Sequence, residues 1–374
     1  MKYLLTTALL LSLLACGKAE PSTTNSVVTP AVTDVPMLHI AARIGVELGD
    51  SNFVFGVIQG VDFTPTGDVV ILDGQKKIVR VFSPSGDFLG DLGGEGEAPG
   101  EFLSPRGIAC LDDGRIAVTD PFSREVEVFD GSLLHLETIS DFTGRAPFVI
   151  TGAGSGFAGE QGGFNRNEGV VTTSVALWED IYEGPTMHVF YEIEDSFSPE
   201  NMIERFMKPQ AGLAADRTNI YYSAPVSEEY SVSVFPLDGS EAYTLGFPDY
   251  SPVAKSEEDI QEDITAYEYR LQAMAASGRG GRLAGATYNP PSHYYATGSI
   301  GVDSEGNIWV QRGWESNPAF DLFPPGATEP AETVIADPEL NLSGHTFVIT
   351  DRGIAAYDPN PENYPQVLIL HLTE

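Results

Sequence analysis

Short runs of hydrophobic residues, many of them alternating with polar ones, follow one another along most of the chain and are separated by Gly, Pro, Asp and Ser. Two such segments, 61–82 and 108–129, match at a fixed offset of 47 residues, which carries Gly67 onto Gly114. Alternation with a period of two, with turn residues between the runs, predicts strands joined by hairpins. A repeat of this length in a β pattern is typical of propeller blades.

Each repeat is interpreted as one four-stranded sheet. Its first strand ends at Gly67 or Gly114, because glycine supplies the positive φ that a tight hairpin needs. The second strand ends in Asp73 or Asp120, the third strand alternates, and an outer strand such as 88–92 leads to the next repeat. Such a sheet has two apolar faces, so it must pack against a neighbour on each side.

The pattern returns less regularly in the rest of the chain. A third blade is expected over 147–193, with strands at 170–178 and 187–191, and the glycines of 152–156 with Gly159 as a turn cluster. Strands of three further blades are expected at 212–216, 220–222, 230–235, 300–310, 347–358 and 366–370.

The last repeat lacks an outer strand, and the segment 37–44, MLHIAARI, has the pattern of one. We predict that 37–44 forms the outer strand of the last sheet, because this pairing removes an exposed sheet edge and joins the two ends of the array. The predicted fold is therefore an all-β, six-bladed β-propeller over 37–374, closed by its N-terminal strand.

An insertion between blades, 248–297, is predicted to contain a helix over 257–276. Ser256 and Asp259 have the spacing of a capping box, and apolar residues recur along the segment at helical spacing. We expect this helix to pack on the side of the propeller; the alternative is a flap over one mouth of the central channel.

The N-terminus resembles a bacterial lipoprotein signal. Residues 1–15 have one early lysine and an apolar run too short to span a bilayer, and they end in Leu-Leu-Ala before Cys16. We expect cleavage before Cys16, lipidation of its thiol, and a flexible tether over 16–36. The protein would then be membrane-anchored, facing the periplasm or the cell surface, and Gly17 in place of Asp favours the outer membrane.

The formal net charge is −34, and the sequence pI is about 4.3. Such a surface repels phosphate backbones, so nucleic acid is excluded as the main partner. With Cys16 lipidated, Cys110 is left within an apolar run, and we expect it to be a buried, inert thiol. No cysteine spacing typical of a metal site is present.

The segments 93–102 (GGEGEAPGEF) and 104–109 (SPRGIA) resemble those of bacterial six-bladed propeller lipoproteins related to the NHL repeat. The resemblance implies that the glycine-rich stretch crosses from one blade to the next. Related propellers include lyases with a histidine zinc site and lactonases that bind a divalent cation. Neither ligand set can be matched to this chain, so no metal ligand, catalytic residue or cofactor is predicted, with a divalent cation as the alternative.

Five residues are candidates for ligand binding at the loops around the channel. Arg106, at the start of a first strand, could grip a carboxylate or phosphate, or form a salt bridge with Glu101 or a nearby Asp. Asp73 and Asp120 end second strands, where an Asp usually bonds the backbone of its own turn. Arg312 and Trp314 occupy the equivalent loop of a later blade and could stack on a ring or a peptide.

No nucleophile elbow, phosphate loop or dinucleotide motif is present. The first hypothesis is therefore a non-enzymatic cell-envelope lipoprotein that binds a protein, peptide or glycan with the loop face of the propeller. The second is a metal-dependent hydrolase or lyase acting at the channel, and the third is an extracellular sensor or adhesin component.

Overall fold

The computed structural model describes residues 35–374 except positions 141, 143–144, 166, 180–185, 199–202, 206, 277–286 and 374, and except the side chains of 273–276. The chain divides into two units, Met1–Asp34 and Val35–Glu374, and the description concerns the second. Cys16 lies outside the described residues. Within them, no helix is long and apolar enough to cross a membrane.

Most of the described chain is β-structure, arranged as four separate four-stranded sheets and one eight-stranded sheet. The strands of the first two sheets are β2 (Ile58–Phe63), β3 (Val69–Asp73), β4 (Ile78–Phe82), β5 (Phe88–Gly93), β6 (Gly107–Cys110), β7 (Ile116–Asp120), β8 (Glu125–Phe129) and β9 (His135–Ile139). Those of the next two are β10 (Val149–Ala153), β11 (Gly156–Asn165), β12 (Val170–Glu179), β13 (Thr186–Ser196), β14 (Gly212–Ala215), β15 (Asn219–Ser223), β16 (Ser231–Pro236) and β17 (Tyr243–Gly246).

The eight-stranded sheet combines both ends of the described chain. Its strands are β1 (Met37–Ile44), β18 (Thr297–Val302), β19 (Ile308–Arg312), β20 (Ala319–Phe323), β21 (Glu332–Ala336), β22 (Thr346–Thr350), β23 (Gly353–Tyr357) and β24 (Val367–Thr373). They pair in the order β18-β19-β20-β21-β1-β24-β23-β22, and a short 3-10 helix, η2 (Pro338–Leu340), follows β21.

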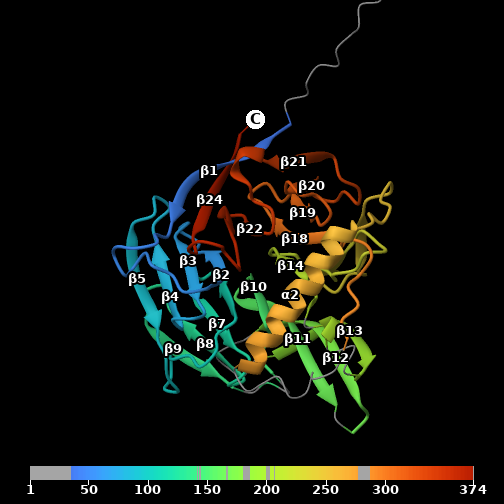
Figure 1. Ribbon diagram of the computed structural model, residues 1–374. Helices are drawn as coiled ribbons and strands as arrows, with labels where there is room; N and C mark the ends of the chain where they lie inside the picture. The colour runs from blue at the N-terminus through green and yellow to red at the C-terminus, as the bar shows by residue number, and fades with distance from the viewer. Residues whose placement is uncertain are drawn as a thin grey trace, which may run out of the picture. The chain divides into compact units, whose positions relative to one another are not determined.

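The sheets radiate from a common centre, as the view along the axis in Figure 1 shows. Their first strands β2, β6, β10, β14, β18 and β22 contact one another in that order, and β22 contacts β2. In each run of four, consecutive antiparallel strands then lead outward. The predicted all-β propeller arrangement is therefore confirmed.

Strand β1 joins the ends of this arrangement. It pairs with β24 along its length, from Met37 opposite Thr373 to Ile44 opposite Val367, so the predicted pairing of these two segments is confirmed. It also pairs in parallel with β21 through two residues, Met37 and Leu38. The expectation of separate four-stranded sheets is wrong here, because β1 bonds on both edges and merges β18–β21 with β22–β24 into one sheet.

Apolar side chains fill the space between neighbouring sheets. Val70 and Leu72 of β3 pack with Ile108 and Ile116 of the next sheet, and all four are at most 5% exposed. Burial of these faces on both sides is the reason that the first repeats show nearly continuous apolar runs. The same packing recurs between the second and third sheets, where Phe157 and Trp178 of the third sheet pack with Val126 and Val128 of the second.

The third sheet differs from its prediction in length. The strands expected at 170–178 and 187–191 are present as β12 and β13, but both are longer, and β11 was not predicted. The expected glycine turn cluster is only partly a turn, because Gly156 and Gly159 belong to β11. A Cβ at Gly156 would lie 2.1 Å from the carbonyl oxygen of Trp178, so this glycine permits close strand packing.

The predicted helix is confirmed as α2 (Glu257–Ala276). The capping box is also present: the Asp259 backbone N–H donates to the Ser256 hydroxyl at 3.1 Å, and the Ser256 N–H donates to the Asp259 carboxylate at 2.9 Å. Its buried side packs through Tyr267 and Leu271 against Ile203 and Met207.

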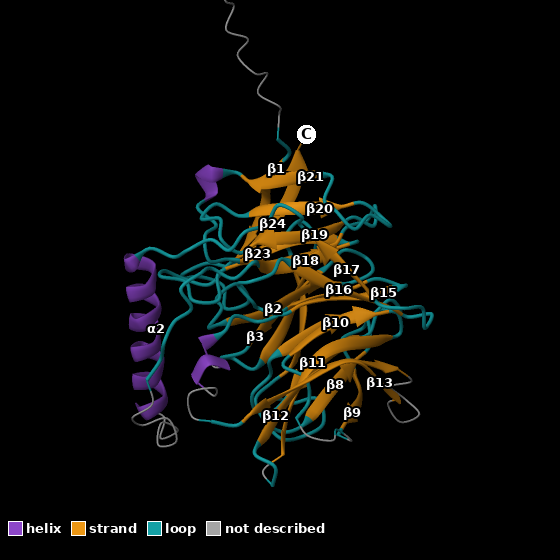
Figure 2. Cartoon of the chain, turned by 90° about the vertical axis from the view of Figure 1, so that its right-hand side faces the viewer, coloured by secondary structure: helices purple, strands orange, loops and turns teal. Residues whose placement is uncertain are grey.

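The position of α2 corrects the expectation that it packs on the outer side of the propeller. The helix lies on the face towards the viewer in Figure 1 and stands beside the strand layer in Figure 2. Asp259 and Arg270 of α2 line the central channel together with residues of the first strands. The apolar stripe in the sequence identifies a buried helix face but not the surface that it contacts.

We predict that Leu38→Ala lowers the free energy of unfolding by about 2–5 kcal/mol, because Leu38 is fully buried between β21 and β24. Chemical denaturation measures the change. The matched control is Arg43→Ala, an exposed residue of the same strand that bonds Gln366 at 3.3 Å, with an expected change of less than about 0.5 kcal/mol. Equal, small effects of the two substitutions would contradict the role of β1.

Candidate functional site

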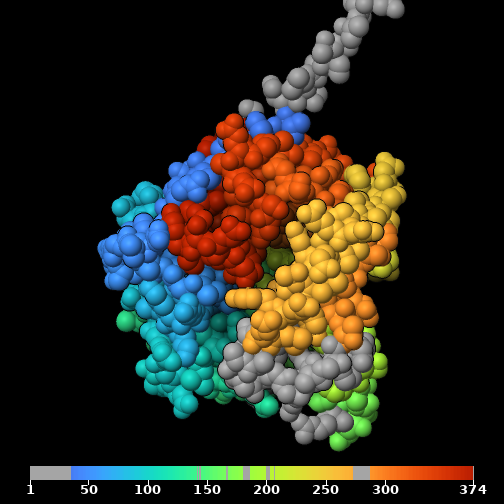
Figure 3. Space-filling model, viewed as in Figure 1, coloured from blue at the N-terminus to red at the C-terminus, as the bar shows by residue number. Residues whose placement is uncertain are grey.

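A channel of about 1190 Å³ runs between the first strands. Figure 3 shows a hollow on the α2 face, between α2 in gold and the C-terminal strands in red. We call the end at which the first strands begin the α2 mouth; its charged lining residues are Arg106, Lys208, Asp259, Arg270, Arg312 and Glu315. We call the end with the hairpins between first and second strands the far end.

Next to the α2 mouth, a surface that we call the cationic wall combines Arg106 and Phe148 of the channel lining with Phe122 and Arg145, which lie beside that lining. Phe122, directly after β7, is 52% exposed. The Cζ atoms of Arg106 and Arg145 lie 5.9 and 5.1 Å from the centroid of its ring. Arg106 also donates from Nη1 to Oε1 of Gln59 at 3.0 Å, and Phe148, which lines the channel, meets the Phe122 ring edge-on at 6.1 Å. This wall offers positive charge and a stacking face together.

The predicted site residue Arg312 lines the mouth, but its guanidinium is largely engaged within the protein. Its Nε and Nη2 donate to both carboxylate oxygens of Asp321, at 2.7–3.1 Å, and Asp321 is 1% exposed. These hydrogen bonds raise the pKa of Arg312 above its usual value. Burial, and then the charge of Asp321, raise the pKa of Tyr230, whose hydroxyl donates to the same carboxylate at 3.0 Å. The main role of Arg312 is therefore to neutralise the buried carboxylate of Asp321.

Trp314, the second predicted residue of this loop, also lines the mouth. It is half-buried and packs against Tyr250 and Tyr230, with ring centroids 5.2 and 6.1 Å away. The Cζ atom of Arg312 lies 5.9 Å from its centroid. Trp314 thus belongs to an aromatic cluster at the mouth and presents only part of its ring to the channel.

Asp73 and Asp120 bond the backbone, as their position at strand ends indicates. Asp73 accepts from the N–H groups of Gly56, Val57 and Lys76 at 2.8–3.2 Å. Asp120 accepts in the same way from the loop that enters its sheet and from its own turn; the donors are Leu103, Ser104, Phe122 and Ser123. Both side chains are at most 2% exposed and hold the inter-sheet loops in place.

The N-terminal half of α2 is fastened to the segment that follows it. Hydrogen bonds from Ser256 and Tyr294 lower the pKa of Asp259 to about 2, and the bond to Asp259 raises the pKa of Tyr294 to about 12. Lys255 pairs with Asp263 at 2.6 Å and lies 5.6 Å from the Tyr294 ring centroid. These contacts fix the helix beside the mouth.

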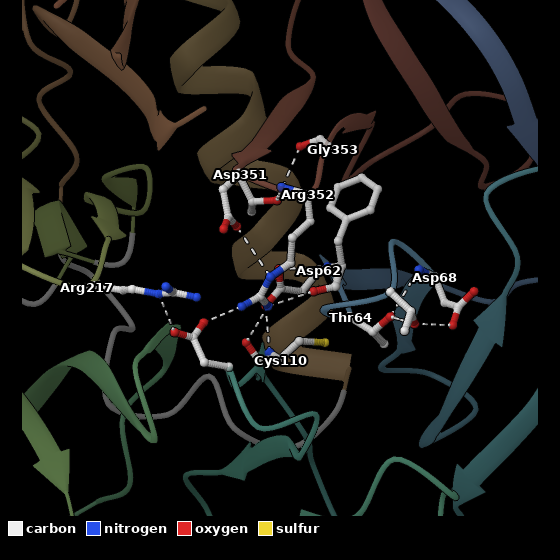
Figure 4. Close-up of polar contacts among 12 residues, drawn as sticks. Asp62, Thr64, Asp68, Cys110, Arg217, Asp351, Arg352 and Gly353 are labelled. Atoms are coloured by element: carbon white, nitrogen blue, oxygen red, sulfur yellow. Dashed lines mark hydrogen bonds and ion pairs between the residues drawn. The ribbon is translucent and has the colours of Figure 1, made fainter. Parts of the chain in front are cut away.

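The far end is lined by a separate cluster, drawn in Figure 4 with α2 behind it. Asp62 of β2 accepts from the N–H groups of Phe63 and Cys110 at 2.7 Å, and burial raises its pKa to about 6. Nη1 of Arg352 donates to the carbonyl oxygens of Phe63 and Cys110 at 3.1 Å, and Nη2 pairs with Asp112. Arg352 therefore ties the β22–β23 hairpin to β2 and β6.

Two further features belong to the far end. Arg217 is bound to the other oxygen of Asp112 at 3.1 Å, which extends the ion pairs towards β14 and β15. The expectation of a buried Cys110 is confirmed, since its thiol is 2% exposed and burial raises its pKa. The far end is thus occupied by contacts between strands.

Histidines contribute to local pairs. His39 bonds Asp337 at 3.1 Å, and His135 bonds Glu127 at 2.7 Å. Among the residues that the structure describes, no group of three or more His, Cys, Asp or Glu side chains is arranged to hold a metal ion.

The mouth residues differ in how visible they are in the sequence. Arg106, Arg312 and Trp314 were predicted, and they line the channel. Phe122 was missed although it follows Asp120 by two residues, in the loop that the repeat already places at the mouth. Lys208 and Arg270 carry no such signal, because their position depends on how the connection after β13 and the helix α2 lie across the channel.

No protein-family model and no curated protein sequence matches the chain. A solved structure of a member of the DUF4221 family from Bacteroides vulgatus is similar with a TM-score of 0.51, at 10% identity over 91% of this chain and 99% of that one. The virginiamycin B lyase of Staphylococcus aureus (TM-score 0.45, 10% identity, 90% and 100% covered) and the Swd1 β-propeller domain of Myceliophteria thermophila (0.46, 9%, 90% and 100%) are also similar. At these identities the likeness concerns the fold, which is an all-β propeller.

We predict that Arg312→Ala lowers the free energy of unfolding by about 3–5 kcal/mol, because it leaves Asp321 buried without its cation. The double variant Arg312→Met with Asp321→Asn keeps an acceptor for Tyr230 and removes the uncompensated charge, so it should recover a large part of that loss. Chemical denaturation compares the two variants. A double variant that is less stable than Arg312→Ala would contradict the pairing.

Proposed function

We propose that the protein is a cell-envelope lipoprotein that binds a protein, peptide or glycan at the α2 mouth of a six-bladed propeller. The observation that carries the proposal is the channel itself. Its volume of about 1190 Å³ is slightly above the range typical of ligand-binding cavities. Its mouth is lined by Arg, Tyr and Trp side chains. The contacts at the far end favour the α2 mouth as the entrance.

The count of six blades is part of the proposal. It treats the eight-stranded sheet as two blades, β18–β21 and β22–β24 with β1, joined where β1 touches β21. The succession of first strands around the channel, with β22 next to β2, supports it. A relationship to NHL-repeat lipoproteins is proposed on the segments 93–102 and 104–109.

Anchoring through Cys16 is proposed from the signal at 1–15. Replacing Cys16 with Ser is expected to move the protein from the membrane to the soluble fraction, because the thiol would carry the lipid. The matched control is Cys110→Ser, which removes the other cysteine and should leave partitioning unchanged. Membrane fractionation with detection by immunoblot checks this, and unchanged partitioning of the Cys16 variant would refute lipid anchoring.

Ligand binding can be followed through Trp314, since it lines the mouth while Trp178 and Trp309 are at most 2% exposed. Titration with soluble peptidoglycan fragments, outer-membrane polysaccharide and peptide mixtures is expected to give a saturable change in tryptophan emission for one class. Trp314→Phe should remove the signal and Phe122→Ala should weaken binding about tenfold, because a stacking face is lost.

The control for this titration is Leu134→Ala, a residue 65% exposed on the turn before β9. It should leave the affinity unchanged. Saturable binding that Phe122→Ala does not weaken would place the ligand away from the mouth and contradict the proposal.

The alternative is a metal-dependent hydrolase or lyase acting at the channel. Metal analysis of the purified protein after dialysis separates the two: the binding proposal expects no retained metal. Zinc or calcium retained in stoichiometric amount would favour the enzyme.

A further inference from the structure

Basic residues are concentrated at the α2 mouth of a chain that is otherwise strongly acidic. The whole sequence has 20 Lys and Arg against 54 Asp and Glu. At the mouth the lining reverses this ratio, with Arg106, Lys208, Arg270 and Arg312 against Asp259 and Glu315. Arg312 pairs with Asp321 and Lys208 with Glu204, but the collection of scarce basic side chains around one opening still favours an anionic ligand.

These cations are combined with aromatic rings. Arg106 and Arg145 flank the half-exposed ring of Phe122, within 5.9 Å of its centroid. Across the channel Arg312 lies within 5.9 Å of both Trp314 and Phe247. A guanidinium binds a carboxylate with two parallel hydrogen bonds, and an aromatic face stacks on an apolar ring face. A ligand that carries a carboxylate and an apolar ring face in one unit would contact the guanidinium groups and the aromatic rings together.

The charge around the mouth limits how many negative groups the ligand can have. The exposed side of α2 carries Glu257, Glu258, Glu262 and Glu268, and the whole chain has a net charge of −34. At physiological salt, charges act over about 8 Å, so a densely charged chain would be repelled by this rim. A single carboxylate within an otherwise neutral ligand could still reach the cationic wall.

We propose, as a refinement of the proposed binding function and resting on it, that the α2 mouth recognises a glycan with isolated uronate residues. The sugar ring packs on the exposed part of Phe122, and the guanidinium groups of Arg106 and Arg145, which lie over the same ring, bind its carboxylate. A sugar offers an apolar ring face next to the acid group, whereas an acidic peptide side chain offers the carboxylate without a ring. The paired rings and cations therefore favour the acidic glycan over the acidic peptide.

The test uses matched probes on the full-length protein in detergent. Isothermal titration calorimetry is performed with an oligosaccharide of one glucuronate on three xyloses, its methyl ester, neutral xylotetraose, and a Gly-Glu-Gly-Gly peptide. The acidic oligosaccharide is expected to bind at least tenfold more tightly than each of the others, because only it supplies both the ring and the charge.

Variants locate the contact. Arg145→Gln is expected to weaken binding of the acidic oligosaccharide about tenfold while leaving binding of its methyl ester unchanged. Phe122→Leu should weaken both. Arg145→Lys, which keeps the charge without the planar fork, should lose less than Arg145→Gln. The charge-matched control Arg43→Gln, on the exposed side of β1, should change neither.

Two kinds of failure are distinguishable. Equal binding of the acid and its ester, tighter binding of the peptide, no binding of the acid, or an unchanged affinity in Arg145→Gln would overturn the uronate assignment. If a neutral or peptide ligand nevertheless binds with dependence on Phe122, the proposed binding function stands. Binding that no substitution at the mouth affects would overturn both.

Discussion

The structure depends on a sheet edge that must be closed by the other end of the chain. The repeats end with a three-stranded unit, β22–β24, whose outer edge would expose unpaired backbone groups and apolar side chains. β1 covers this edge with a full antiparallel pairing, and Leu38 and Ile44 fill the space on either side with no exposed surface. At the centre β22 contacts β2, so every first strand around the channel also has two neighbours.

The same closure is reinforced at the far end by polar contacts. Arg352 reaches from the β22–β23 hairpin to the carbonyl oxygens of Phe63 and Cys110, so it binds the last sheet to the first two. Asp62 fastens β2 to β6 through the Cys110 N–H. These contacts join strands of different sheets at one end of the channel, which is why the α2 mouth, with its cations and rings, is proposed as the ligand-binding end.

Much of the architecture could be predicted from the sequence because the buried strands appear there as repeated apolar runs. The apolar runs of β3 and β7, the turn glycines Gly67 and Gly114, and the closing strand β1 all carry local signals. The lengths of β11 and β13 could not be predicted, since the end of β11 and nearly all of β13 are exposed and burial imposes no alternation there. The merging of two sheets by β1 and β21 is a contact between distant segments for which neither segment has a pattern.

The candidate site was only partly predictable for the same reason. The repeat places Arg106, Arg312 and Trp314 at the mouth, but it does not show that Arg312 neutralises Asp321 or that Trp314 packs on two tyrosines. Asp73 and Asp120 illustrate the opposite case, in which position within the turn alone indicated a backbone role. The contribution of α2 required its placement over the channel, which depends on packing between Tyr267 and the connection before β14.

Hydrogen exchange of the native protein, read at peptides covering β1 and β24, measures whether β1 completes the ring. If β1 completes the ring, its amides exchange as slowly as those of β2 and β22, because they open only when the whole structure unfolds. Rapid exchange across β1 while the first strands stay protected would show that the ring holds without its closing strand, and that β1 is not needed for closure.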